Sequence, residues 1–428
     1  MKILKQILFV LFTGIFLFSC GKTEQGPSLV STAGADAVDP YLTKDHHGNP
    51  VISWTEKDPS DSLYRLKYAV YDSVSAKFGK PVTVSTSIGA KASAESMNKV
   101  GFKKDGTVIA VFAKRFENEK NPYAGAIYYS MSADDGQNWS TPKFLHSDTS
   151  RAYGRGFFDI TNLKNGELAA VWLDGRFGRT IKGSSLFFAS TEKGSGFDNE
   201  QCLTQGTCEC CRTDILTDTH GNIHIAFRNI MFPSSLLGKQ ARDMAYVSSS
   251  DNGKTFASVK TISNDHWAIE GCPHTGPSLA STDQAVFATW FTAGGSSGVY
   301  YTGLPGSQDK FSPRKPLSTE GRHPQMISIT NNSLAFVWEE ASSNHPAKGS
   351  NSHSHVHMAK NEASAASSTI VLKILNGSNE AKNIALTDGE LPEHHPVLIS
   401  VDDQLLIAWV REENGRAGIY FTTVDPKK

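Results

Sequence analysis

Four of the six cysteines in this 428-residue chain lie within ten positions, at Cys202, Cys208, Cys210 and Cys211. Thiols this close together could bind a metal ion, form disulfides or act as a redox centre. The stretch GTCECCRTDI has no second local Cys-x-x-Cys pair, so it does not match an isolated zinc knuckle. The choice among these chemistries therefore depends on the compartment and on what the fold brings near the thiols.

The first residues indicate export. Two lysines precede an apolar stretch over residues 7–18, which is too short for a spanning helix and is typical of a signal peptide. Its end, Leu-Phe-Ser-Cys20, resembles the lipobox of bacterial lipoproteins. The resemblance implies a signal peptide over 1–19, lipidation of Cys20, a tether over 20–34 and a cell-envelope location, at the outer membrane because Gly21 follows the cysteine. An ordinary secretory signal is the alternative.

The overall charge limits the class of partner. The formal net charge is −1 and the basic residues are scattered, so we expect no nucleic-acid partner. Beyond residue 20 no segment is apolar for long enough to span a bilayer. We expect a monomer that reaches the membrane through its N-terminal lipid.

One motif recurs seven times along the chain: a turn with Gly, Asn or Asp leads into an apolar strand that ends at an aromatic residue. The aromatic residues are Trp54, Phe112, Trp172, Phe227, Trp290, Trp338 and Trp409. The spacing of roughly fifty to seventy residues is typical of a four-stranded propeller blade with long loops. Long apolar patterns of helical period are missing, so we expect few helices.

A second motif accompanies the first. SADDGQNW (132–139) and SSDNGKTF (249–256) share the pattern S-x-D-x-G-x-x-[WF], and STEKGSGF (190–197) is a degenerate copy. These stretches resemble the Asp-box, or bacterial neuraminidase repeat, of sialidase-like propellers. In such a turn, Ser and Asp bond backbone amides and Gly supplies a positive φ, so the box braces the fold and performs no chemistry.

The resemblance implies one all-β domain over residues 35–428, a sialidase-like β-propeller of four-stranded blades. The repeats predict seven blades, whereas enzymatic sialidases have six, which is the alternative. The last repeat has no fourth strand after it. The N-terminal segment PSLVSTA could supply that outer strand and so close the ring without exposed edges.

The propeller geometry predicts which residues gather around the central channel. The starts of the innermost strands and the loops after the second strands lie on one face. The arginines expected there are Arg155, Arg176, Arg212, Arg228, Arg322 and Arg411, and the carboxylates are Asp174, Glu339 and Glu340. The resemblance implies that arginines bind a substrate carboxylate and that acidic residues catalyse hydrolysis.

Two departures leave catalysis open. The family's Arg-Ile-Pro signature is absent, and the first blade shows Asp39-Pro40-Tyr41 instead. The last blade opens with His394-His395 where the family would place its tyrosine nucleophile. We expect recognition of a glycan or another anionic ligand; an enzyme would be an exo-sialidase-like glycoside hydrolase.

A non-enzymatic propeller with a metal site is the alternative. Thiolate and imidazole ligands suit copper or zinc. The residues expected near one another on the rim are Cys210, Cys211, Cys272, His274, His323 and His395. A separate candidate, His353, His355 and His357, would share one strand face, although a solvated loop is the favoured interpretation.

Disulfides are the third interpretation of the thiols. Lipidation of Cys20 would leave five cysteines in an oxidising compartment, which is an odd number. Cys211 (or Cys210) and Cys272 occupy equivalent points of neighbouring blades, so a bridge there would join the two blades. Cys202 with Cys208 would close a small loop and leave one thiol over.

Overall fold

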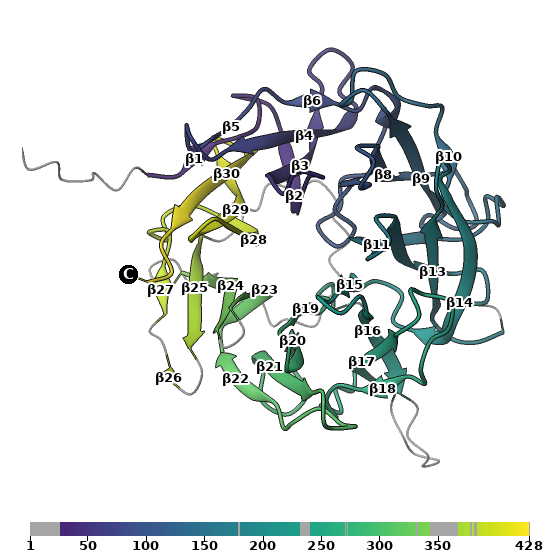
Figure 1. Cartoon of the computed structure of the whole chain (residues 1–428), viewed down its shortest axis with the longest axis vertical. Coiled ribbons are helices and arrows are strands. Elements are labelled where there is room, and N and C mark those ends of the chain that lie inside the picture. The colour runs from purple at the N-terminus through teal and green to yellow at the C-terminus, as the bar shows by residue number, and fades with distance from the viewer. Residues whose placement is uncertain are drawn as a thin grey trace, which may run out of the picture.

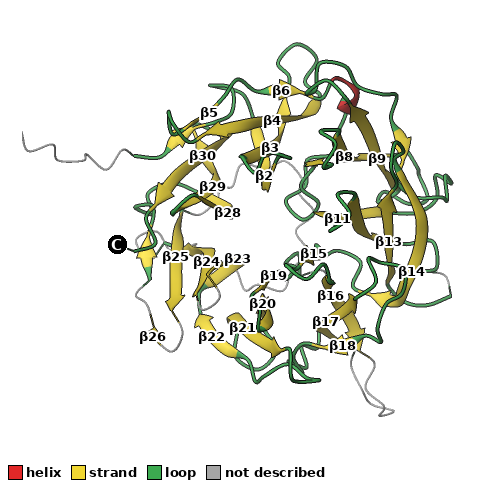
Figure 2. Cartoon of the chain, in the orientation of Figure 1, coloured by secondary structure: helices red, strands yellow, loops and turns green. Residues whose placement is uncertain are grey.

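The computed structural model describes residues 26–178, 180–231, 240–269, 271, 273–330, 333–342, 367–376, 379–380 and 383–427. The proposed signal peptide, Cys20, Cys272 and the His353, His355 and His357 cluster lie outside these residues. Within them, no helix has the length and hydropathy needed to cross a membrane. The chain is all-β, and a three-residue 3-10 turn, η1 (Ser85–Ser87), is the one helical element that the described residues contain (Figure 2).

The strands form antiparallel ladders that follow one another around a ring (Figure 1). The first two ladders are β2 (Ala37–Lys44), β3 (Pro50–Lys57), β4 (Tyr64–Asp72), β5 (Lys77–Phe78) and β6 (Val82–Thr83), and then β7 (Lys99–Phe102), β8 (Val108–Arg115), β9 (Gly125–Ser132) and β10 (Lys143–Phe144). The next ladder is β11 (Arg155–Asn162), β12 (Leu168–Asp174), β13 (Ser184–Thr191) and β14 (Phe197–Thr207).

Two ladders follow in the same manner. They are β15 (Asp214–Thr217), β16 (Ile223–Met231), β17 (Ala241–Ser249) and β18 (Lys260–Thr261), and then β19 (Ser278–Ser281), β20 (Ala285–Thr292), β21 (Gly298–Pro305) and β22 (Lys315–Ser318). The ladders of β11 and β15 join into one sheet through a single residue pair, Thr207 with Asn229.

The last two ladders complete the ring. They are β23 (Gly321–Thr330), β24 (Ser333–Ala341), β25 (Ser368–Asn376), β26 (Asn379–Glu380) and β27 (Ile384–Ala385), and then β28 (Glu393–Val401), β29 (Gln404–Glu413), β30 (Arg416–Val424) and β1 (Ser28–Leu29). β1 pairs antiparallel with β30, Ser28 opposite Phe421. The prediction that the N-terminal segment supplies the outer strand of the last repeat is confirmed.

The first strand of each ladder lies nearest the centre of the ring (Figure 1). Each of these inner strands contacts the inner strands of both neighbouring ladders, and β2 contacts β7 on one side and β28 on the other. The ring therefore closes through its inner strands as well as through the outer pairing of β1 with β30.

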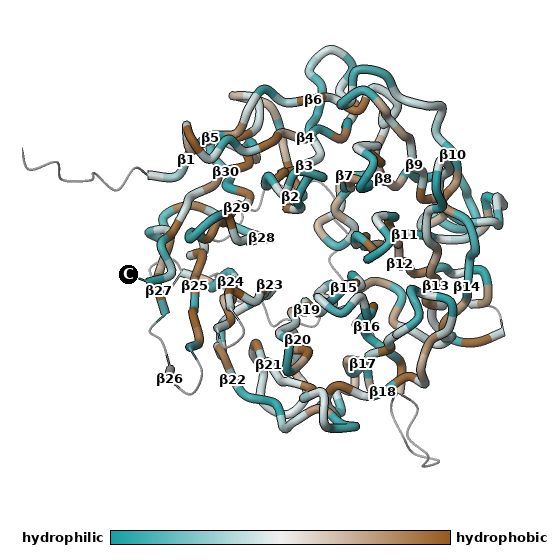
Figure 3. Tube along the Cα trace, viewed as in Figure 1, coloured by the Kyte–Doolittle hydropathy of each residue, from teal (hydrophilic) through white to brown (hydrophobic). Residues whose placement is uncertain are grey.

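The aromatic repeat marks the second strand of every ladder, and all seven aromatic side chains are fully buried. They lie in apolar clusters shared by neighbouring ladders; one cluster joins Trp54 of β3 with Ala408 of β29 and Ile419 of β30. Hydrophobic segments accordingly recur along the tube in every part of the ring (Figure 3). The periodic apolar strands of the sequence thus form a ring of apolar clusters, each between neighbouring ladders.

The Asp-boxes connect third to fourth strands, as predicted. Ser132 Oγ accepts from the Gly136 amide at 2.9 Å, and Asp134 Oδ1 accepts from the Asn138 amide at 2.9 Å. The box at 249–256 repeats these bonds through Ser249 and Asp251. Gly136 has a φ of +85°, and a Cβ on it would lie 2.3 Å from the Tyr68 hydroxyl. Only glycine satisfies both requirements.

Candidate functional site

Several inner strands begin with an irregularity that turns a side chain out of the ladder. The register of β2, β11, β23 and β28 shifts near its start. Asp39, His323 and His395 lie at these shifts with φ values of +62°, +46° and +52°, and each precedes a proline. Bulges of this kind re-aim side chains, and positive φ in non-glycine residues clusters at functional sites. The three residues are therefore candidates for a site at the centre of the ring.

A histidine pair bridged by a carboxylate forms the centre of this site. Glu339, at the end of β24, has Oε1 2.7 Å from His323 Nδ1. Its Oε2 accepts from the His395 backbone amide at 2.6 Å. The two imidazole rings are 4.5 Å apart, centroid to centroid. Ligand atoms of all three residues lie within 4.8 Å of one another, so the group also meets the distance requirement of a cation site.

The pKa values of the two histidines are shifted in opposite directions. Burial alone lowers the pKa of His323, but the charge of Glu339 and the hydrogen bond to it outweigh burial, so this pKa is raised. The second ring nitrogen, Nε2, lies 3.2 Å from the His274 carbonyl oxygen. Because both nitrogens face acceptors, these contacts favour the imidazolium form of His323.

His395 is held neutral beside it. Burial, followed by the positive charge of His323, lowers the pKa of His395 to about 3. Its Nδ1 is buried and has no hydrogen-bond partner among the described residues. Glu339 remains ionised, because its interactions with His323 outweigh burial and hold its pKa low. The site thus places a neutral imidazole next to an imidazole whose pKa is raised, a combination that general acid–base catalysis uses.

Arg212 crosses the space between the inner strands. Its guanidinium donates to the carbonyl oxygens of Pro324 at 2.7 Å and Pro277 at 3.4 Å. Its backbone amide donates to Glu95 Oε2 at 2.9 Å, while Glu95 Oε1 is buried without a hydrogen-bond partner in the described structure. Arg212 is therefore a brace of the centre, rather than an open arm of a carboxylate clamp.

A second buried ionic group lies beside β2, β7 and β11. The Lys99 ammonium donates to the carbonyls of Ser96, Met97 and Phe158 at 2.6, 2.8 and 2.9 Å, and it is 4.9 Å from the Tyr41 ring centroid. Burial lowers the pKa of Lys99 to about 8. Lys99 is not among the candidate site residues predicted from the sequence. The pattern that could have indicated it is a lysine in an otherwise apolar inner strand.

Asp39 is one of the inner-strand carboxyls whose pKa is raised, and Asp214 is another. It is buried and accepts from the Ser93 amide. Burial raises its pKa to about 7, so at neutral pH a fraction of the molecules hold a proton there. A carboxyl near the start of an inner strand that holds a proton at neutral pH is able to act as a proton donor.

Asp174, a predicted catalytic residue, belongs to an internal ion network. It bonds Arg155 Nε at 3.0 Å and Arg176 Nη2 at 2.6 Å, and Arg176 also pairs with Glu200 at 2.8 Å. Despite burial, the Arg176 hydrogen bond and the arginine charges hold the pKa of Asp174 below its usual value. The structure brings Arg155, Arg176 and Asp174 together, but as partners of one another.

Three more predicted residues form hydrogen bonds or ion pairs within the protein. Arg228 is buried and donates to the carbonyls of Arg242, Thr275 and Phe291. Glu340 accepts from the Trp338 indole at 2.7 Å and from the Ser318 hydroxyl. Arg411 pairs with the buried Glu393 at 2.6 Å.

Arg322 is the exposed member of the predicted arginine set. Its guanidinium lies 4.0 Å from the Phe291 ring centroid and donates to the Gly321 carbonyl at 2.8 Å. Among the described residues it forms no ion pair. It is one residue from His323 and is available to an anionic ligand.

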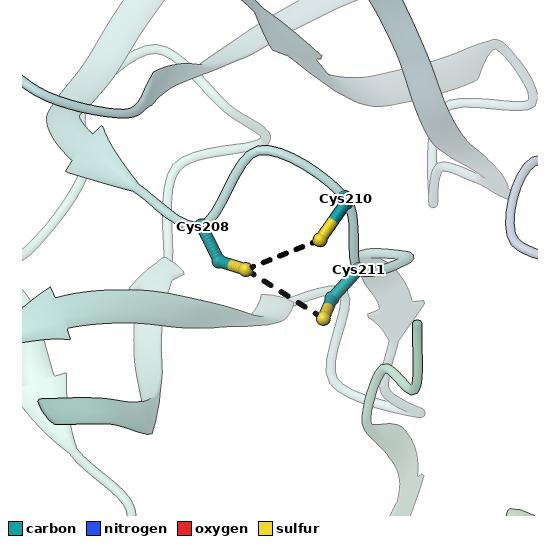
Figure 4. Close-up of side chains that lie close together, drawn as sticks. All are labelled: Cys208, Cys210 and Cys211. Carbon is teal, nitrogen blue, oxygen red and sulfur yellow. Dashed lines mark hydrogen bonds between the residues drawn. The ribbon is translucent and has the colours of Figure 1, made fainter. Parts of the chain in front are cut away.

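Three of the four clustered cysteines meet in a second place, in the loop between β14 and β15 (Figure 4). Cys208 Sγ lies 3.7 Å from the Sγ of Cys210 and 3.7 Å from that of Cys211. The structure contains no disulfide among the cysteines it describes. Cys202 is exposed on β14, with its sulfur 3.8 Å from the Thr204 carbonyl oxygen.

The predicted Cys/His rim cluster therefore divides in two. His323 and His395 group with Glu339, while Cys210 and Cys211 group with Cys208. Cys272, which was expected to join them, lies outside the described residues. The Cys211–Cys272 and Cys202–Cys208 bridges stay predictions.

No protein-family model and no curated protein matches the chain. Solved structures, however, do match the chain. An ulvan lyase of polysaccharide lyase family PL25, bound to -[GlcA(1-4)Rha3S]-, is 11% identical with a TM-score of 0.56, covering 93% of this chain and 96% of that one. Polysaccharide lyase Uly1 is 9% identical with a TM-score of 0.53 over 96% and 94%. NanB sialidase from Streptococcus pneumoniae is 9% identical with a TM-score of 0.48 over 91% and 86%. At these identities the likeness is one of fold.

Proposed function

We propose that this protein is a glycan-acting propeller that cleaves an anionic polysaccharide by β-elimination at the centre of the ring. The observation that carries the proposal is the group formed by His323, Glu339 and His395. It holds a charged and a neutral imidazole 4.5 Å apart, next to the exposed Arg322. Export and a lipid anchor at Cys20 belong to the same proposal and rest on the N-terminal sequence.

The arrangement favours elimination over sialoside hydrolysis. Hydrolysis with a three-arginine clamp needs arginines whose forks are open to a substrate carboxylate. Arg155 instead pairs with Asp174, and Arg212 and Arg228 donate hydrogen bonds to backbone carbonyls. Of the predicted catalytic carboxylates, Asp174 and Glu340 are engaged in internal bonds, which leaves Glu339 as a partner of histidines.

Elimination needs the groups that the centre does offer. A base removes the proton on the carbon next to a uronate carboxylate, a carbon–carbon double bond forms, and the bond to the glycosidic oxygen breaks as an acid protonates that oxygen. Neutral His395 is the base. The acid is the imidazolium of His323 through Nε2, once the glycosidic oxygen replaces the His274 carbonyl as the hydrogen-bond acceptor of that nitrogen. Arg322 pairs with the substrate carboxylate, whose negative charge also raises the pKa of His395 towards the working pH.

The fold comparison supports this chemistry. The two polysaccharide lyases match over more than nine-tenths of both chains, and one was solved with a glucuronate-containing saccharide. We also propose that each four-stranded ladder is one blade, giving seven. The six-blade alternative would require the ladders of β11 and β15, which share one residue pair, to count as a single blade.

The test is an assay of the purified protein on uronate-containing polysaccharides, sulfated and unsulfated, with a neutral glycan and a sialoside alongside. We expect ultraviolet-absorbing unsaturated uronate products, a loss of about 10²-fold or more in kcat for His395→Ala and His323→Ala, and no effect of His220→Gln. His220 is a matched control because it lies exposed on the turn between β15 and β16. Sialic acid release with no unsaturated product would refute elimination.

A further inference from the structure

The loop that leads from β14 to β15 carries three thiols that the proposed glycan chemistry does not use. Cys208, Cys210 and Cys211 are 0%, 4% and 1% exposed, and Phe157 packs against them. The Cys208 sulfur is equidistant from the other two, at 3.7 Å. A disulfide needs a sulfur–sulfur distance of about 2.05 Å, so none of these contacts is a bond.

The sulfur–sulfur distances fit a metal ion. Four ligands placed tetrahedrally at the usual zinc–sulfur distance of about 2.3 Å lie about 3.8 Å apart. Two of the three sulfur–sulfur distances are 3.7 Å, within 0.1 Å of that spacing, and all three are within 4.8 Å. We propose that Cys208, Cys210 and Cys211 together bind one thiophilic d10 metal ion, zinc(II) or copper(I).

The surroundings supply the charge that such a site requires. Arg242, on β17, donates from Nη1 to Cys208 Sγ at 3.0 Å and also to Glu209 Oε2 at 2.7 Å. Three thiolates and a divalent ion carry one net negative charge, which this guanidinium offsets. Hydrogen bonds from the neighbouring thiols, together with the charges of Arg242 and Arg228, lower the pKa of Cys208 well below its usual value. Burial, the largest cause, raises the pKa of Cys211 well above its usual value, so the electrostatics favour a thiolate at Cys208, and Cys211 would lose its proton as the metal binds.

The position of the loop connects the metal to the centre of the ring. Residue 212 follows the last thiol directly, and its backbone amide donates to Glu95. The Thr213 hydroxyl donates to the Phe157 carbonyl at 2.8 Å. A metal that fixes the three thiols therefore also fixes the start of β15 and the brace formed by Arg212. The inference concerns metal binding and does not depend on the glycan chemistry.

The experiment is metal titration of the reduced, metal-free full chain without oxygen, with zinc(II) in one arm and copper(I) in the other. We expect one equivalent of ion to bind with a thiolate-to-metal charge-transfer band, and alkylation of the three thiols to be blocked. Cys208→Ser should weaken binding about 100-fold or more. Cys202→Ser is the matched control, because this exposed cysteine lies outside the cluster. X-ray absorption then separates the ions: four nearest ligands for zinc, three for copper.

Arg242→Gln is the second variant, because it leaves all three ligands in place. We expect it to weaken binding about tenfold, in line with the loss of a group that orients a metal ligand. If wild-type protein binds neither ion below micromolar concentration, the metal site is wrong. Mass mapping that finds a disulfide among Cys208, Cys210 and Cys211 in protein isolated from its native compartment would also overturn it.

Discussion

At the scale of the residue, Glu339 positions both histidines of the proposed chemistry. Its two oxygens face His323 Nδ1 and the His395 amide. The neighbouring carboxylate, Glu340, points to the Trp338 indole instead, because successive strand residues face opposite sides of a sheet. Two adjacent glutamates thus have different roles, one electrostatic and one in packing.

We predict that Glu339→Gln lowers the pKa of His323, because the amide keeps the shape of the carboxylate but removes its charge. The imidazolium would then be lost at lower pH. Since the pKa of wild-type His323 is raised by folding, its stabilising contribution is present below the unfolded pKa of about 6.5 and is lost as pH rises through the folded value. NMR titration of the histidine ring protons measures this shift. Glu340→Gln should leave the His323 midpoint in place, and an unchanged midpoint in Glu339→Gln would contradict the assignment.

At the scale of the element, the Asp-box turn depends on a glycine that is closely packed. Gly253 has a φ of +83°, and a Cβ on it would lie 2.6 Å from Phe188 Cζ. Phe188 belongs to the apolar core of the β11 and β15 ladders. The turn therefore locks the outer part of one ladder onto the core of its neighbour.

We predict that Gly253→Ala lowers the free energy of unfolding by about 2–4 kcal/mol, from a strained φ and the clash with Phe188. Gly48→Ala is the matched control. It has a φ of +89° with no atom within 4 Å of the added Cβ, so it isolates the backbone cost, about 1 kcal/mol. Urea denaturation of both variants gives the difference. Equal losses would mean that the contact with Phe188 contributes nothing.

At the scale of the whole molecule, the N-terminal segment closes the ring. β1 pairs with β30, and next to it the Val30 amide donates to the Ile419 carbonyl at 2.8 Å while Ser31 Oγ accepts from the Ile419 amide at 3.1 Å. The first and last ladders also share an apolar cluster. Closure thus joins segments almost 390 residues apart and covers the edge of β30.

We predict that a chain beginning at residue 32 is less stable than one beginning at residue 26, by about 2–3 kcal/mol. The loss comes from the hydrogen bonds that Val30 and Ser31 make to Ile419, at about 1 kcal/mol each, and from the partial burial of Val30. The uncovered edge of β30 should also promote self-association. Denaturant unfolding and light scattering measure the two effects. Identical unfolding curves and monomeric behaviour for both chains would show that β1 does not contribute to closure.

Much of this architecture is readable from local sequence. The seven aromatic-ended strands, the Asp-boxes and the starts of the inner strands are repeats of short patterns, and each pattern follows from backbone requirements within a few residues. The pairing of the N-terminal segment with the last strand was predictable because a propeller needs a fourth outer strand there. The face on which His323 and His395 lie was predictable for a different reason, because both residues lie at the starts of inner strands, which share one face of such a ring.

Which polar groups on that face remain free for a ligand was decided only by the tertiary structure. Arg212 meets Glu95 across 117 positions of the chain, and Arg228 donates to a carbonyl 63 positions away. The sequence repeats do not predict such residue pairs, because the pairs depend on how neighbouring ladders pack. The same packing separates the thiols from the histidines, although the sequence predicted that both would lie together on the rim. Repeats follow from the chain's own backbone geometry, whereas a site follows from side chains that meet only after the ring has closed.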